Sequence, residues 1–339
     1  MSYGFMLRLG LEFKNKLHVG CVMTNSTYTE VSHSDDCEKY INQFIQEFPL
    51  RSAEIGNGTV IKRALPSRHK RMIGAWCFLD HAGPVNFAAG EGLDVGPHPH
   101  IGLQTFTWMI EGTMLHSDSL GTKDQLIQPR QVNLMTAGYG ISHTEVAPAN
   151  ETVMHAAQLW IALPDDKRNM APAFENYPEL PLVQEQGIDF TVLVGHYLNT
   201  VSPVKVHTEL LGVDLFAAAD THARLPLNGK FEYGFMLLEG EGARINGHEL
   251  TVDNMVILEP GLDAVDIQIS AGSRVLLLGG EPFESPILLW WNFVGRTQAE
   301  LAEAREQWLN QDARFGSIPH YQGERLKAPE LPAGMRASK

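Results

Sequence analysis

Cysteine is scarce in this chain of 339 residues. The three cysteines, Cys21, Cys37 and Cys77, are odd in number and widely spaced. A disulfide scaffold or a thiolate zinc site needs more cysteines at closer spacing, so the sequence argues against both. The same scarcity is typical of proteins kept in a reducing environment, and we therefore expect a cytoplasmic protein.

Long apolar runs and positive charge are also lacking. The longest apolar run, residues 287–294 (ILLWWNFV), contains Asn292 and is far shorter than the ~18–20 residues of a membrane span. Lys and Arg number 26 against 40 Asp and Glu, which gives a net charge of −14. Because phosphate neutralisation dominates affinity for nucleic acids, we expect neither a membrane protein nor a direct DNA or RNA binder.

The composition is that of a folded protein. Apolar residues make up 44% of the chain and charged residues 19%, which excludes wholesale disorder. At roughly 150 residues per domain, the length predicts about two domains. The apolar stretch 5–11 is interrupted by Arg8 and makes a poor secretory signal. Met23 is a second candidate start, so residues 1–22 are left out of the fold prediction.

Two segments have helical patterns. Residues 35–48 carry apolar side chains at spacings of three and four, which predicts an amphipathic helix within an N-terminal extension, residues 1–50. Residues 297–309 open with Thr297 and Glu300, a capping box, and predict a helix in a C-terminal helix and tail, residues 296–339.

From about residue 58 to 290 the pattern is different. Short apolar or alternating runs are broken by Gly, Pro, Asn and Asp every 8–12 residues, which predicts an all-β sandwich or barrel. The segment TWMIEG, ending at Gly112, resembles FMLLEG, ending at Gly240, and LMTAG resembles ILEPG downstream. We interpret this as an internal repeat. The Pro-rich, charged residues 163–188 would cross between the two copies.

Two pairs of residues suggest a metal site. His98 and His100 are separated by Pro99, and His143 and Glu145 by Thr144. In an extended strand, residues i and i+2 point to the same face, so each pair presents both side chains together. Three imidazoles and one carboxylate suit a borderline divalent ion, namely Fe, Mn, Ni, Cu or Zn. The alternative is that the two pairs are independent loop features.

The other histidines carry weaker signals. His116 is undecided and leans towards a structural role. His81 and His155 are interpreted as structural, with a role behind the metal ligands as the alternative. The remaining histidines have no ligand-like neighbour at short spacing and are expected to be structural or exposed: His18, His33, His69, His196, His207, His222, His248 and His320.

The stretch from Gly92 to Glu145 resembles the pirin family within the cupin superfamily. The motifs HPH, EG, HxDxxG and MTAGxGIxHxE follow one another in the family's order, and a weaker resemblance extends from about residue 58 to 295. It implies a bicupin: a metal-binding barrel over residues 51–165, a second barrel without metal over 185–295, and short flanking helices.

The resemblance also implies a site and an activity. The ligands would be His98, His100, His143 and Glu145, around one divalent ion that is usually iron. The activity would be quercetin 2,3-dioxygenase-like, cleaving a small aromatic substrate with O₂. Glu145 would also be the catalytic acceptor of the substrate's hydroxyl proton. The alternative is an iron- or redox-sensing regulatory protein with a protein partner, and a metal-dependent isomerase is a third reading.

Some positions bear on these hypotheses. Gln104 stands where many pirins carry Glu, and we expect the lost carboxylate to lie near the site. Phe106, Trp108 and Met135 are expected mainly in the barrel core, with a substrate pocket as the alternative. The basic residues from Lys62 to Arg71 are expected to be solvated, with a partner contact as the alternative.

The second copy of the repeat can be tested for ligands by its spacing. The offsets that place His98, His100, His143 and Glu145 in the first copy lead to Pro226, Asn228, Asp266 and Gln268 in the second. None of these is a histidine, so we predict a single metal in the first barrel. Only His222 would change this, if the loop shifts.

Overall fold

The computed structural model describes residues 22–25, 28–31, 42–56 and 58–337. The chain divides into two compact units, residues 1–46 and 47–339. In the first unit, β1 (Val22–Asn25) pairs antiparallel with β2 (Tyr28–Val31). No helix among the described residues has the length and apolar character needed to cross a membrane.

The helix predicted over residues 35–48 is wrong at its C-terminal end. Residues 45–49 form strand β3 (Ile45–Pro49), while residues 35–41 lie outside the described part of the chain. Proline disfavours the helical conformation of the residue before it, so Pro49 directs Phe48 towards an extended backbone. The Phe48 ring then stacks on His69, with ring centroids 4.9 Å apart. The spacing of the apolar residues did not reveal the effect of Pro49 or the stacking of Phe48 on His69.

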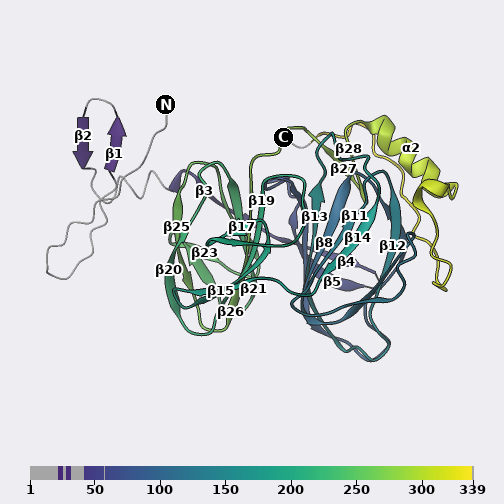
Figure 1. The fold of residues 1–339 in the computed structure, drawn as a ribbon, viewed down its shortest axis with the longest axis horizontal. Helices are drawn as coiled ribbons and strands as arrows, with labels where there is room; N and C mark the ends of the chain where they lie inside the picture. The colour runs from purple at the N-terminus through teal and green to yellow at the C-terminus, as the bar shows by residue number, and fades with distance from the viewer. Residues whose placement is uncertain (1–21, 26–27, 32–41, 57, 338–339) are drawn as a thin grey trace. The chain divides into compact units, whose positions relative to one another are not determined.

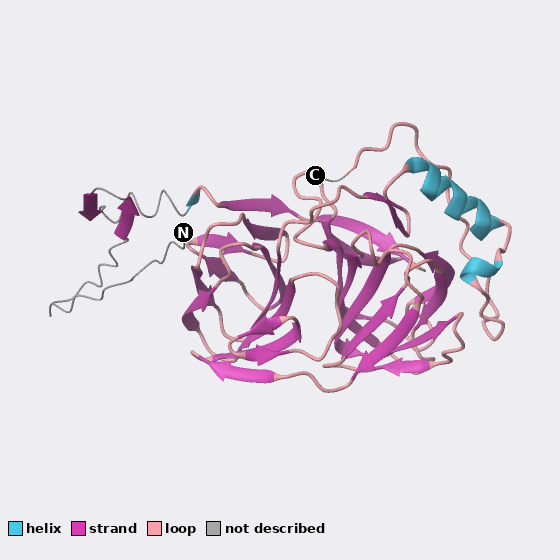
Figure 2. Ribbon diagram, turned by 45° about the horizontal axis from the view of Figure 1, so that its top comes forward, coloured by secondary structure: helices cyan, strands magenta, loops and turns pink. Residues whose placement is uncertain are grey.

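Two antiparallel sheets form a first barrel (Figures 1 and 2). The larger has the order β14-β11-β8-β13-β6-β5-β4, with bounds β4 Arg51–Ile55, β5 Thr59–Leu65, β6 Trp76–Asn86, β8 Leu103–Gly112, β11 Val132–Thr136, β13 Val153–Ala162 and β14 Ala173–Tyr177. The smaller has the order β10-β9-β12-β7, with bounds β7 Asp94–His100, β9 Met114–Asp118, β10 Gln125–Ile127 and β12 Ile141–Val146.

A second barrel repeats this arrangement. Its larger sheet has the order β15-β16-β19-β26-β21-β24-β3, with bounds β15 Leu182–Glu185, β16 Ile188–Val194, β19 Leu210–Ala217, β21 Glu232–Glu239, β24 Asn254–Leu258 and β26 Ser273–Gly280. Its smaller sheet has the order β20-β25-β22-β23, with bounds β20 Thr221–Pro226, β22 Ala243–Ile245, β23 His248–Leu250 and β25 Ala264–Ile269. A separate hairpin joins β17 (His196–Tyr197) to β18 (Thr200–Val201).

The strand orders confirm the predicted all-β fold of two tandem barrels. Read in reverse, the second large sheet matches the first, so that β21 corresponds to β8 and β24 to β11. These are the strands that carry the repeated sequence segments. The repeat is therefore a duplicated β-unit.

The two large sheets share one apolar core. Trp76, Phe106 and Trp108 of the first barrel belong to the same buried cluster as Met236 and Leu276 of the second. Polar contacts cross it as well. The indole of Trp108 donates to Asp214 Oδ2 over 3.0 Å, and Arg274 pairs with the other oxygen of this buried carboxylate over 2.6 Å. Burial of apolar surface in this shared core stabilises the contact between the two barrels.

The C-terminal segment returns to the first barrel. It contains β27 (Leu288–Trp290), β28 (Phe293–Gly295), α2 (Gln298–Leu309) and a 3₁₀ turn, Ala313–Phe315. Phe293 forms a parallel bridge with Ile101 at the end of β7, and the hydroxyl of Ser142 donates to Phe315 O. Strands β27 and β28 thus lie within the predicted limits of the second domain and yet contact the first barrel.

Helix α2 agrees with its predicted position. The Thr297 side chain accepts a hydrogen bond from the Glu300 amide, as in a capping box. The Glu300 carboxylate, however, accepts from the Arg296 amide, one residue before the cap. Leu301, Ala304 and Trp308 are buried and share a core cluster with Ile101 of the first barrel.

Trp308 should stabilise this covering segment strongly. It is 2% exposed, and its indole donates to Leu326 O over 2.8 Å. We expect Trp308→Ala to lower the free energy of unfolding by about 3–5 kcal/mol, the usual cost of truncating a buried aromatic residue. Leu309→Ala is the matched control, because Leu309 is 43% exposed. Urea unfolding of both variants tests this, and equal losses would contradict it.

Candidate metal centre

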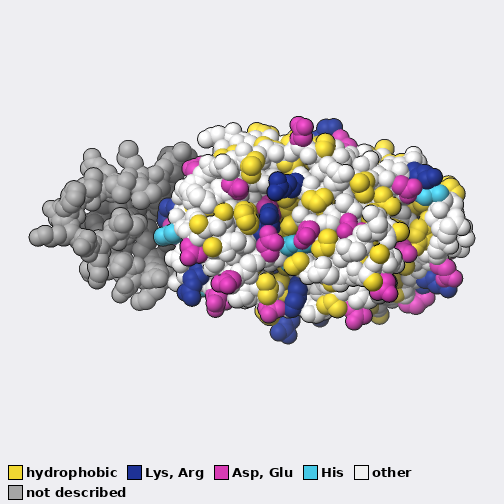
Figure 3. All heavy atoms as spheres, turned by 90° about the horizontal axis from the view of Figure 1, so that it is seen from below, with side chains coloured by type: hydrophobic (Ala, Val, Ile, Leu, Met, Phe, Trp, Pro, Cys, Tyr) yellow, Lys and Arg dark blue, Asp and Glu magenta, His cyan; other side chains and the backbone are white. Residues whose placement is uncertain are grey.

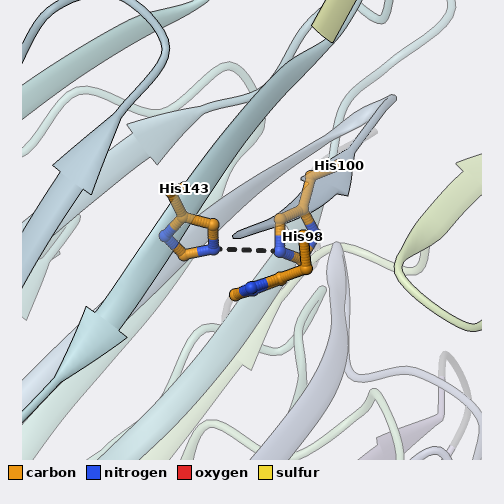
Figure 4. Close-up of side chains that lie close together, drawn as sticks. All are labelled: His98, His100 and His143. Carbon is orange, nitrogen blue, oxygen red and sulfur yellow. Dashed lines mark hydrogen bonds between the residues drawn. The ribbon is translucent and has the colours of Figure 1, made fainter. Parts of the chain in front are cut away.

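Three histidines meet inside the first barrel. Strands β7 and β12 pair antiparallel, with His143 directly opposite His98. His100 lies two residues beyond His98 on the same face of β7. The three residues offer ligand atoms that all lie within 4.8 Å of one another, and their side chains are 5%, 1% and 1% exposed for His98, His100 and His143 (Figure 4). The sequence prediction that these three residues converge agrees with this geometry.

Two of the three imidazoles are oriented by backbone carbonyls. His98 Nδ1 lies 2.9 Å from Gly96 O, and His100 Nδ1 lies 3.0 Å from Asn292 O. A carbonyl oxygen only accepts, so each Nδ1 carries the proton and each Nε2 keeps its lone pair, which at His100 accepts a hydrogen bond from His143 Nε2. Asn292 belongs to the turn between β27 and β28, so the C-terminal segment orients one ligand of the first barrel.

The third imidazole is oriented by side chains. His143 Nδ1 lies 3.3 Å from His116 Nδ1, and His116 Nε2 lies 3.1 Å from Asp118 Oδ2. Burial alone would raise the pKa of Asp118, but hydrogen bonds from His116 and Thr122 hold this pKa below its ordinary value. An ionised Asp118 accepts a hydrogen bond from His116 Nε2, so His116 Nδ1 can accept from His143 Nδ1 once a metal replaces the hydrogen bond between His100 and His143.

The donor set fits a divalent metal. Burial lowers the pKa of His98 to about 4 and holds the pKa values of His100 and His143 well below 6.5, so all three rings are neutral at pH 7. The Nε2 atoms of His100 and His143 lie 3.1 Å apart (Figure 4). Two nitrogens each ~2.1 Å from a shared ion would be separated by about 3.0–3.4 Å. The pair is therefore spaced for one ion.

Glu145 lies next to this group but outside it. It follows His143 by two residues on β12 and lies opposite His116 of β9, beyond an irregularity in the pairing of β12 with β7. The side chain is half-buried, and burial raises its pKa to about 7. None of the described residues donates a hydrogen bond to this carboxylate. Its part in metal binding stays a prediction.

Sequence reasoning missed three residues around the histidines. His116 was undecided, although its HxD spacing puts it on one face of a strand with Asp118. The ring of Phe174 stacks on His116, with centroids 4.2 Å apart, and Trp160 meets His100 edge-on at 5.1 Å. Phe174 and Trp160 come from β14 and β13, far along the chain, and no local pattern marks them.

Gln104 lies away from the histidines, contrary to expectation. It shares a face of β8 with Phe106 and Trp108, which pack in the core between the barrels. Its amide donates to Thr136 Oγ1 over 2.9 Å and to Lys205 O over 3.3 Å. A carboxylate at this position would therefore not face the site.

The remaining candidates have the core positions that were preferred for them. Met135 packs in a core cluster with Leu103 and with Trp160, whose ring contacts His100. His81 and His155 form a buried pair with their Nε2 atoms 2.8 Å apart, and His155 Nδ1 lies 3.8 Å from a carboxylate oxygen of Glu239. The histidine pair thus belongs to the contact between the barrels.

The corresponding sheet of the second barrel has an apolar interior. Ala223 and Leu225 of β20 and Val265 and Ile267 of β25 are all buried. Asp266, the position that the spacing assigns to His143, pairs across the strands with Arg224, and the two form an exposed ion pair. The buried side chains of Ala223, Leu225, Val265 and Ile267 thus fill the space that the first barrel uses for its imidazoles.

Comparisons with known proteins agree with this architecture. The Pirin family profile matches residues 58–161, and the profile of the Pirin C-terminal cupin domain matches residues 212–316. A Pseudomonas aeruginosa protein provisionally named quercetin 2,3-dioxygenase is 50% identical over 303 residues, covering 89% of this chain and 96% of that protein.

Solved structures give the same result. The crystal structure of a quercetin 2,3-dioxygenase from Acinetobacter baumannii has a TM-score of 0.87 and 73% identity, and covers 88% of this chain and 100% of that one. A bacterial pirin of Escherichia coli in complex with nickel(II) shares the fold, with a TM-score of 0.55, 21% identity, and coverage of 70% and 99%. With two family profiles matching more than half of its length, the chain belongs to the pirin family.

Proposed function

We propose that this protein is a metal-dependent dioxygenase that cleaves a small polyhydroxylated aromatic substrate of the flavonol class. The observation that carries the proposal is the convergence of three neutral, buried imidazoles, whose ligand atoms all lie within 4.8 Å of one another. The names of the Pseudomonas and Acinetobacter relatives support the choice of quercetin as the test substrate.

His98, His100 and His143 would hold the metal, with Glu145 as the fourth ligand after a change of rotamer. Four protein ligands on a six-coordinate ion leave two positions for substrate and O₂. When bound, the metal would favour ionisation of a substrate hydroxyl and mediate electron transfer between the substrate and O₂. Iron is the expected metal, with Mn, Ni, Cu and Zn as alternatives. The cytoplasm stays the expected compartment, on cysteine content alone.

The surrounding residues would contribute in three ways. Glu145, with a pKa near 7, is matched to accept the proton of a substrate hydroxyl at neutral pH. The edge of Trp160 beside His100 and the face of Phe174 on His116 would keep the three rings in place and exclude water. Backbone carbonyls hold His98 and His100 in the ligating tautomer without any side-chain movement.

The alternative function, a metal-sensing interaction protein, gains little support from the basic segment. Lys62 pairs with Asp253, Arg63 with the buried Asp80, and Lys70 with Glu232 and Glu259. On the face drawn in Figure 3, basic and acidic side chains are interspersed. A binding surface for an acidic partner would instead leave such positive charges unpaired.

Oxygen consumption with quercetin tests the enzyme directly. We expect turnover by protein loaded with at least one of Fe(II), Mn(II), Ni(II), Cu(II) or Zn(II), and loss to background in His98→Ala. His222→Ala is the matched control, because His222 lies exposed on the second barrel and its loss should leave the rate unchanged. Absence of oxygen uptake with all five metals would contradict the proposal.

Glu145 should give the metal-free protein a distinctive pH dependence. The folded state keeps the Glu145 proton to about pH 7, whereas the unfolded chain releases it near 4.5. The stability that this residue contributes therefore falls as the pH rises from 4.5 to 7, by at most about 3 kcal/mol. Glu145→Gln cannot ionise and should lack this loss.

Urea unfolding of both metal-free proteins at pH 5 and pH 7.5 measures the effect. The titrating histidines are the same in both, so their contributions cancel in the difference. Wild-type protein should lose stability relative to Glu145→Gln at the higher pH. A difference that does not change with pH would show that Glu145 is not held in a desolvated environment.

A further inference from the structure

The three imidazoles differ in what holds their second ring nitrogen. His98 and His100 donate to backbone carbonyls, which no substitution removes. His143 depends on the side chain of His116, which in turn depends on that of Asp118. In Figure 4, His143 turns one ring nitrogen towards His100 and the other away from the cluster. The nitrogen that lies away from the cluster is the one that meets His116.

The orientation of Asp118 is itself fixed. Its Oδ1 accepts hydrogen bonds from the Leu120 amide over 2.9 Å and the Thr122 amide over 3.2 Å. Its Oδ2 is therefore the atom left for His116. The side chain is buried, with 2% of the residue exposed. Neither solvent nor side-chain rotation offers His116 Nε2 another acceptor.

The orientation of His116 is fixed as well. Its ring is 3% exposed and lies almost parallel to that of Phe174, at an interplanar angle of 13°. Exchange of its two nitrogens would require a flip of the ring against this stack. With a metal on His143 Nε2 in place of the hydrogen bond to His100, the two contacts form a directed chain, in which His143 donates to His116 and His116 donates to Asp118.

We propose that Asp118 and His116 form a positioning pair that keeps the proton of His143 on Nδ1 and so leaves its Nε2 free for the metal. The inference rests on the proposed metal-binding role of the three histidines. Partners of this kind, behind the ligands, generally set the tautomer and the direction of a metal-bound imidazole. Neither residue contacts the ion or the substrate, so neither is catalytic.

Asp118→Asn should reverse the chain without changing its shape. The asparagine oxygen would stay with the amides of Leu120 and Thr122, because only an acceptor fits there, and the amide nitrogen would face His116. His116 Nε2 would then have to accept, and its proton would move to Nδ1. His143 Nδ1 would accept in turn, and its proton would occupy Nε2, where the metal should bind.

The His116→Phe variant distinguishes the chain of hydrogen bonds from a purely structural role of Asp118. Phenylalanine can keep the stack on Phe174 but transmits no hydrogen bond, so His143 becomes free to choose its tautomer. In this background the additional Asp118→Asn substitution should have almost no effect. A structural role for Asp118, in its turn with Leu120 and Thr122, would instead give equal effects in both backgrounds.

Binding of Ni(II), measured by competition with a chromophoric chelator, tests the proposal. We expect Asp118→Asn to weaken Ni(II) binding by about 10–100-fold, and by less than about 3-fold when added to His116→Phe. Asp124→Asn is the matched control, since Asp124 contacts Ser117, the neighbour of Asp118, and takes no part in the hydrogen bonds that link His143, His116 and Asp118. Its affinity should equal that of wild type.

Unchanged Ni(II) affinity in folded Asp118→Asn would overturn the proposal. A different result would contradict the proposed dioxygenase function alone. If wild-type protein binds Ni(II) but consumes no oxygen in any metal form, the dioxygenase proposal is wrong, while the positioning pair still stands.

Discussion

The site depends on the register of one strand pair. Because β12 pairs with β7 so that His143 lies opposite His98, three imidazoles from two distant segments share one face of the small sheet. A shift of β12 by one residue would turn His143 to the other face, away from His98 and His100, and break up the cluster. The register also leaves the three rings buried, which lowers the pKa of each and keeps it neutral and able to bind a metal.

The rest of the structure preserves this arrangement. The C-terminal segment covers the end of β7, bridges Ile101 through Phe293 and supplies the Asn292 carbonyl that orients His100. The second barrel buries one face of the large sheet in a shared core, and its own small sheet is packed with aliphatic side chains. Of the two repeated barrels, the first therefore carries the histidine cluster and the second serves as its packing partner.

Sequence patterns predicted what is local and periodic. Alternation, turn residues and the repeated EG segments predicted a duplicated all-β unit, and the resemblance to the pirins added the two tandem barrels. The HPH and HTE spacings were enough to predict the three histidines that meet in the first barrel. Contacts that depend on tertiary packing were not predictable. Residues 45–49 form strand β3 although their apolar spacing predicted a helix, and Gln104 faces the other barrel. Trp160, Phe174 and Asn292 reach the site from strands and turns that are distant in the sequence. Glu145, the proposed fourth ligand, is the residue that the spacing predicts and that lies outside the compact group of three histidines.

The central claim is that the Nε2 atoms of His98, His100 and His143 share one cation. Anomalous diffraction from crystals soaked in Ni(II), recorded at the nickel absorption edge, tests it most directly. The account predicts one strong peak in the first barrel, about 2.1 Å from all three nitrogens. A peak confined to surface residues, or a cluster of histidines that stays without metal at saturating Ni(II), would contradict it.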